Sequence, residues 1–141
     1  MRFIKEIAKK YQVVSQKQYK DIHDAAVYYD HLADLAPGST KIWYAITTRD
    51  LGMGYEWCKK QGCLPDPKNL KKTHALIGSV KGTDKERLFH LLQGEMWSPQ
   101  GEARDIIKKS GSSHTSMSVG DVIEVGGKAF MVDQSGFQEL K

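Results

Sequence analysis

The sequence has few of the features that place a chain in a specialised class of protein. Its 141 residues include only two cysteines, Cys58 and Cys63, and two cysteines are too few for the disulfide framework of a small secreted domain. No apolar run approaches the roughly 20 residues that span a bilayer. The first residues, MRFIKE, lack the apolar stretch of a secretory signal. We therefore expect a cytoplasmic protein that does not enter a membrane.

Neither hydrophobicity nor charge is extreme. Hydrophobic residues make up 40% and charged residues 27% of the chain, which is ordinary for a globular protein and excludes disorder along the whole chain. The length fits a single domain. The net charge of +4 is modest. The excess of basic residues is concentrated in residues 41–80, which carry seven basic and three acidic side chains.

Residues 1–38 are predicted to be helical. Apolar side chains recur at helical spacing through this segment, and Ser15 with Gln18 has the form of a capping box. Pro37 and Gly38 are expected to end the second helix. The sequence therefore predicts an N-terminal helical pair over 1–38 and a separate α+β domain over 39–141.

The α+β domain is predicted to hold about five short strands in an antiparallel or mixed sheet covered by helices. Residues 41–47 are rich in β-branched and aromatic residues and apolar on both faces, which indicates a central strand. Gly126 and Gly127 supply the positive φ of a tight hairpin turn. The five strands are expected to begin at Lys41, Thr73, Asp121, Lys128 and Phe137.

Three helices are expected between these strands. A short one runs from Leu51 to the stop at Gly62. A second begins at the capping box formed by Thr83 and Glu86. A third begins at Ser98 with a proline in its first turn and ends at Gly111.

The C-terminal residues resemble a known family. Residues 114–123 (HTSMSVGDVI), a hairpin, and residues 129–137 (AFMVDQSGF) are similar to the end of the YodL-like domain, which has a His-Ser-Leu-Ser-Val-Ser-Asp-Val segment, a hairpin and a Tyr-Val-Asp-Ser-x-Gly-Phe segment. Gly120 stands where that pattern has serine. The resemblance implies an accessory protein of a phage or mobile element, and it implies no particular reaction.

The residues of this motif indicate a structural role and not a catalytic one. Glycines allow turns, and an aspartate can accept backbone N–H groups. We expect a sheet corner built by His114, Ser116, Ser118, Gly120, Asp121, Gly136 and Phe137. The alternative is a small enzyme that uses His114 and Asp121, since histidine, serine and aspartate are the residue types of a nucleophilic triad. Four such residues in one local turn rarely align for catalysis.

A basic cluster is the other candidate site. Lysines neutralise phosphates, and exposed aromatic side chains stack on unpaired bases. The residues that would contact nucleic acid are Arg49, Lys59, Lys60, Lys68, Lys71 and Lys72. The alternative is a solvated face with partly buried aromatics. Trp97, Trp57 and Tyr55 are the candidate anchors for a protein partner.

Metal and cofactor signatures are incomplete. Cys58 and Cys63, with His74 nearby, lack the second matched pair of ligands of a zinc site. Two pairs of glycines are similar to parts of phosphate-binding or dinucleotide-binding loops, but the other residues of those motifs are absent. We expect neither metal nor cofactor. The favoured function is a non-enzymatic accessory protein that binds a host or phage macromolecule, preferably a protein, with nucleic-acid binding as the alternative.

Overall fold

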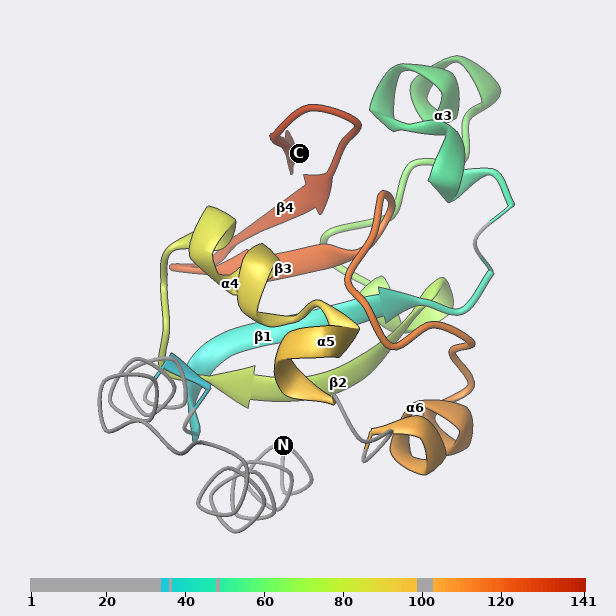
Figure 1. Ribbon diagram of the computed structural model, residues 1–141. Coiled ribbons are helices and arrows are strands. Elements are labelled where there is room, and N and C mark those ends of the chain that lie inside the picture. The colour runs from blue at the N-terminus through green and yellow to red at the C-terminus, as the bar shows by residue number, and fades with distance from the viewer. Residues whose placement is uncertain (1–33, 36, 48, 99–102) are drawn as a thin grey trace, which may run out of the picture.

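The computed structural model describes residues 34–35, 37–47, 49–98 and 103–141 (Figure 1). The helical pair predicted for 1–38 lies almost wholly outside these residues. The described part is an α+β domain, as predicted, and it is built on one sheet of five antiparallel strands. No described helix combines the length and the apolar character that crossing a membrane requires.

The sheet has the strand order β2-β1-β3-β4-β5. Its strands are β1 (Pro37–Ala45), β2 (His74–Val80), β3 (Val122–Val125), β4 (Lys128–Val132) and β5 (Phe137–Leu140). β1 lies between β2 and β3, so the prediction of a central first strand is confirmed. The hairpin turn at Gly126 and Gly127 is also confirmed, because both glycines have positive φ and β3 pairs with β4.

β1 begins four residues before the predicted start at Lys41. Pro37 and Gly38 follow shortly after the helical residue Asp34, and they also begin the strand, in which Pro37 pairs with Val80. Gly38 permits this pairing because a Cβ on it would lie only 2.4 Å from the Cα of Lys81. The close approach joins distant parts of the chain, so the local pattern did not reveal it.

The three predicted helices occur in the expected order with shifted starts, and one further short helix, Gly94–Trp97, was not predicted. α3 (Tyr55–Gln61) follows a 3-10 turn, η1 (Leu51–Met53), and stops at Gly62 as predicted. α4 (Lys85–Leu91) is capped by Asp84 and not by Thr83, because the Asp84 carboxylate accepts the N–H groups of Glu86 and Arg87. α5 (Gly94–Trp97) and α6 (Arg104–Ser110) follow, and a second 3-10 turn, η2 (Leu70–Lys72), precedes β2.

Both faces of the sheet are buried. Successive side chains of β1 point to opposite faces, so they show which core cluster lies on each face. Ile42 and Tyr44 belong to a core cluster with residues of α4, α5 and α6, and α4 and α5 lie in front of the strands in Figure 1. Trp43 and Ala45 point the opposite way, into a second cluster. Residues of α3 and η2, including Cys58, cover that second face.

Candidate functional site

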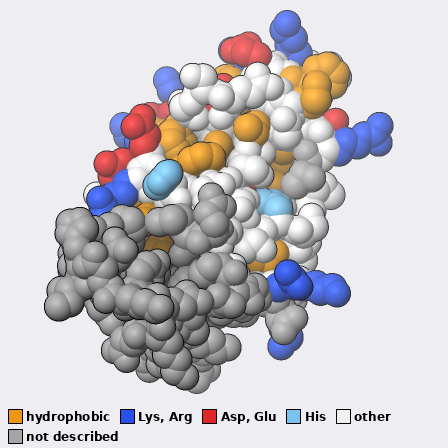
Figure 2. Space-filling model, viewed as in Figure 1, with side chains coloured by type: hydrophobic (Ala, Val, Ile, Leu, Met, Phe, Trp, Pro, Cys, Tyr) orange, Lys and Arg blue, Asp and Glu red, His pale blue; other side chains and the backbone are white. Residues whose placement is uncertain are grey.

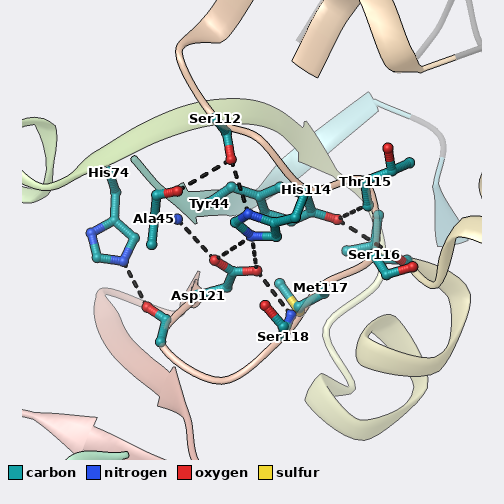
Figure 3. Close-up of polar contacts among 12 residues, drawn as sticks. Tyr44, Ala45, His74, Ser112, His114, Thr115, Ser116, Met117, Ser118 and Asp121 are labelled. Atoms are coloured by element: carbon teal, nitrogen blue, oxygen red, sulfur yellow. Dashed lines mark hydrogen bonds and ion pairs between the residues drawn. The ribbon is translucent and has the colours of Figure 1, made fainter. Parts of the chain in front are cut away.

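Asp121 is the centre of a buried polar network at the end of β1 (Figure 3). It immediately precedes β3 and is 0% exposed. Its Oδ1 accepts the backbone N–H of Ala45 at 2.8 Å, and its Oδ2 accepts that of Ser118 at 2.9 Å. His114 Nε2 lies 2.7 Å from Oδ2 and 2.9 Å from Oδ1. The carboxylate therefore ties the segment 112–121 to a strand 76 residues earlier in the chain.

His114 is held on three sides. Its ring stacks on the Tyr44 ring, with centroids 4.8 Å apart and planes 11° apart. Its Nδ1 lies 3.2 Å from the Ser112 hydroxyl, which also lies 3.1 Å from the Ala45 carbonyl oxygen. The sequence motif did not include Ser112, and the serine that contacts His114 is neither Ser116 nor Ser118.

Ser112, His114 and Asp121 have the residue types of a nucleophilic triad. The Ser112 hydroxyl donates to the Ala45 carbonyl oxygen. Its proton is therefore directed to a backbone acceptor and not to His114 Nδ1, as a catalytic base requires. Ser112 is also only 5% exposed, so the geometry is that of a hydrogen-bonded corner.

The remaining residues of segment 112–121 fasten it to other elements. The Ser116 hydroxyl accepts the Gly94 N–H at the start of α5 at 2.6 Å. The Thr115 carbonyl accepts both the Tyr44 hydroxyl and the Trp97 indole N–H, at 2.8 and 3.0 Å. Burial raises the pKa of Tyr44 well above its usual value, and the Asp121 charge adds to this shift. Tyr44 therefore remains a neutral donor.

His74 completes the corner from β2. Its Nε2 lies 2.7 Å from the Gly120 carbonyl oxygen, and its Nδ1 lies 2.7 Å from the Thr73 hydroxyl. Burial lowers the pKa of His74 below 6.5, although the bond to Gly120 opposes the shift. Both ring nitrogens of His74 therefore already have a hydrogen-bonding partner. No group of three potential metal ligands occurs among the described residues.

The His74 shift predicts a loss of stability on acidification. As the pH falls below 6.5, His74 takes up a proton in the unfolded chain before it does so in the folded one, so the unfolded state is favoured. One such group can change the free energy of unfolding by at most about 1.4 kcal/mol per pH unit. Urea denaturation between pH 7.5 and 5 should show a steeper loss for the wild type than for His74→Gln, which keeps a donor for Gly120. Equal slopes would contradict this assignment.

Cys58 is unsuited to nucleophilic chemistry. Cys58 is fully buried, and its Sγ lies 3.1 Å from the Asp50 carbonyl oxygen. Burial, and then a hydrogen bond with Cys63, raises the pKa of Cys58 to about 12. A thiol with such a pKa carries almost no thiolate at neutral pH.

The three aromatic anchors predicted for a partner do not share a surface. Trp97 is 1% exposed and packs edge-on against Tyr44 in the first core cluster. It is therefore a core residue, and the expectation of an exposed anchor at this position is wrong. Trp57, on α3, is 40% exposed, and Tyr55 is half-buried on the same helix. Of the three predicted anchors, Trp57 alone is exposed.

The predicted basic residues are all exposed, and three lysines line one groove. Arg49, Lys59, Lys60, Lys68, Lys71 and Lys72 are exposed, as is Lys41 on β1. Lys41, Lys68 and Lys71 line a groove of about 450 Å³ beside Trp43 and Leu76, which we call the lysine groove. Trp43 is 6% exposed there, and its indole N–H donates to Glu124. The predicted nucleic-acid site included Lys68 and Lys71 but not Lys41. Lys41 lies near them only because it stands on β1 of the folded sheet.

The chain matches no protein-family model, no curated protein and no solved structure at a significant level of similarity.

Proposed function

We propose that this protein is a non-enzymatic accessory protein that binds single-stranded nucleic acid through the lysine groove. The observation that carries the proposal is the gathering of Lys41, Lys68 and Lys71 around one groove of about 450 Å³. Glu124 is the single carboxylate among the lining residues, and it already accepts the Trp43 indole N–H. A groove with this excess of cations suits a phosphate backbone.

The lysines of the groove, and an exposed tryptophan elsewhere on the same face of the sheet, support a single strand. No lysine of the groove forms an ion pair with another described residue, so these cations are available to phosphates. α3 covers the same face of the sheet and exposes Trp57 one turn from Lys60. The upper right of Figure 2, over α3, shows hydrophobic side chains beside Lys and Arg side chains. Exposed aromatics stack on unpaired bases.

The rival functions have less support. Burial of Trp97 removes one of the two tryptophans that favoured a protein partner. The Ser112, His114 and Asp121 network has its hydrogen bonds satisfied internally, which speaks against a small enzyme at His114 and Asp121. The resemblance of the C-terminal residues to the YodL-like domain supports a role in a phage or mobile element.

Charge reversal in the groove tests the proposal. Lys68→Glu combined with Lys71→Glu should weaken binding of a labelled single-stranded oligonucleotide about tenfold or more, because two phosphate contacts become repulsive. The dependence of log affinity on log salt should also become shallower by about 1.4, since each single-strand contact contributes about 0.7. Fluorescence polarisation at stepwise salt concentrations measures both quantities.

The matched control reverses two lysines elsewhere. Lys81→Glu with Lys109→Glu changes the net charge equally at two exposed positions that do not line the groove. This variant should keep an affinity within about threefold of the wild type, because long-range repulsion is screened at physiological salt. Equal weakening by both pairs would show that only net charge matters, and absence of binding by the wild type at low salt would end the proposal.

A further inference from the structure

We propose that a second pocket, between α6 and the start of segment 112–121, binds a phosphate group of a small molecule. The pocket has a volume of about 280 Å³ and is lined by Arg104, Ile107, Lys108, Ser112, Ser113 and Thr115. We call it the α6 pocket. Figure 2 shows Lys and Arg side chains gathered over α6 at the lower right.

The α6 pocket combines two cations with hydroxyl groups. Arg104 and Lys108 are four residues apart on α6, so they stand on one face of the helix, one turn apart. Ser113 and Thr115 also line the pocket, and their hydroxyls can donate to an oxyanion. An arginine fork beside a lysine point charge is a combination that proteins use for phosphate.

The electrostatics of the α6 pocket favour an anion. No carboxylate is among the lining residues that the structure describes, and neither Arg104 nor Lys108 forms an ion pair with another described residue. The carboxylate behind the pocket, Asp121, is separated from it by Ser112 and His114 and is bound by His114 and two backbone N–H groups. Its charge is therefore compensated within the corner.

The size and position of the α6 pocket separate it from the lysine groove. A volume of about 280 Å³ lies just below the range of drug-sized ligand sites, which is about 300–1,000 Å³, and it suits a small ligand. Ile107 provides an apolar surface beside the cations. α6 packs on the Tyr44 face of the sheet and the lysine groove lies on the Trp43 face, so the two sites are independent.

Phosphate titration tests this site directly. Inorganic phosphate added to the full chain should shift the backbone amide NMR signals of Ser113 and Thr115 in a saturable manner. Sodium chloride and sodium acetate at the same ionic strength should not produce this shift. Arg104→Gln with Lys108→Gln should weaken the apparent phosphate affinity at least tenfold, and Lys109→Gln, on the same helix but outside the pocket lining, should change it less than twofold.

Three results would overturn the proposal. They are linear shifts that do not saturate, equal shifts with acetate or chloride, and an unchanged phosphate affinity in the double variant. All three substituted residues are exposed, so the variants should fold, and unchanged signals from β3 and β4 verify this. Loss of oligonucleotide binding in the groove variants leaves this test unaffected.

Discussion

Asp121→Ala is expected to lower the free energy of unfolding by about 3–5 kcal/mol, because each buried donor that loses its acceptor costs about 1–3 kcal/mol. The substitution leaves three donors without an acceptor, namely the N–H groups of Ala45 and Ser118 and the Nε2–H of His114. A loss of this size is a large part of the stability of a small domain. Urea denaturation followed by tryptophan fluorescence measures it.

Asp66→Ala is the matched control for the Asp121 variant. Asp66 is exposed, and its carboxylate accepts only the nearby Lys68 N–H among the described contacts. This control should cost less than about 1 kcal/mol, as surface substitutions generally do. If Asp121→Ala cost no more than the control, the network would not hold the corner together, and a catalytic role for His114 and Asp121 would regain support.

Gly120→Ala is expected to cost about 2–4 kcal/mol, combining a strained backbone with overpacking. Gly120 has φ +98°, and a Cβ on it would lie 2.7 Å from the Leu51 Cβ and 3.0 Å from the Leu51 carbonyl oxygen. η1 therefore rests directly on this glycine. Denaturation of the variant under the conditions used for Asp121→Ala measures the effect.

Gly111→Ala separates strain from steric conflict. Gly111 has a nearly identical φ of +95°, but a Cβ there would meet nothing within 4 Å. We expect this control to cost about 1–2 kcal/mol from strain alone. Equal losses in the two variants would show that Leu51 yields easily and that the contact does not fix the corner.

Gly120 also bears on the resemblance to the YodL-like domain. The pattern of that family has serine at this position, whereas this chain has glycine. A serine Cβ would meet Leu51 as an alanine Cβ does, so a serine requires either a different φ or a displaced η1. The corner of this protein is therefore adapted to glycine.

Local signals in the sequence predicted much of the fold. The Gly126–Gly127 turn and the helix stops at Gly62 and Gly111 depend on backbone conformations that few other residues adopt, and all three are present. The last three strands begin within one residue of their predicted starts at Asp121, Lys128 and Phe137.

The features that the sequence did not reveal depend on distant pairs. Ala45 and Asp121 are 76 residues apart, and Ser112 and Ala45 are 67 apart, so no local pattern could join them. Lys41 joins Lys68 and Lys71 only because β1 passes beside the segment that follows α3. The sequence near Trp97 did not indicate that its side chain is buried. The acceptor of its indole N–H is the Thr115 carbonyl, which lies 18 residues later in the chain.

The tryptophan side chains offer the most direct test of the account. The chain contains three tryptophans, and each gives one indole N–H signal by NMR. The Trp43 indole lies at the lysine groove, and the Trp97 indole is buried behind the opposite face of the sheet. Titration with a single-stranded oligonucleotide should shift the Trp43 signal to saturation and leave that of Trp97 in place. A fixed Trp43 signal, or a shift of Trp97 alone, would contradict binding at the lysine groove.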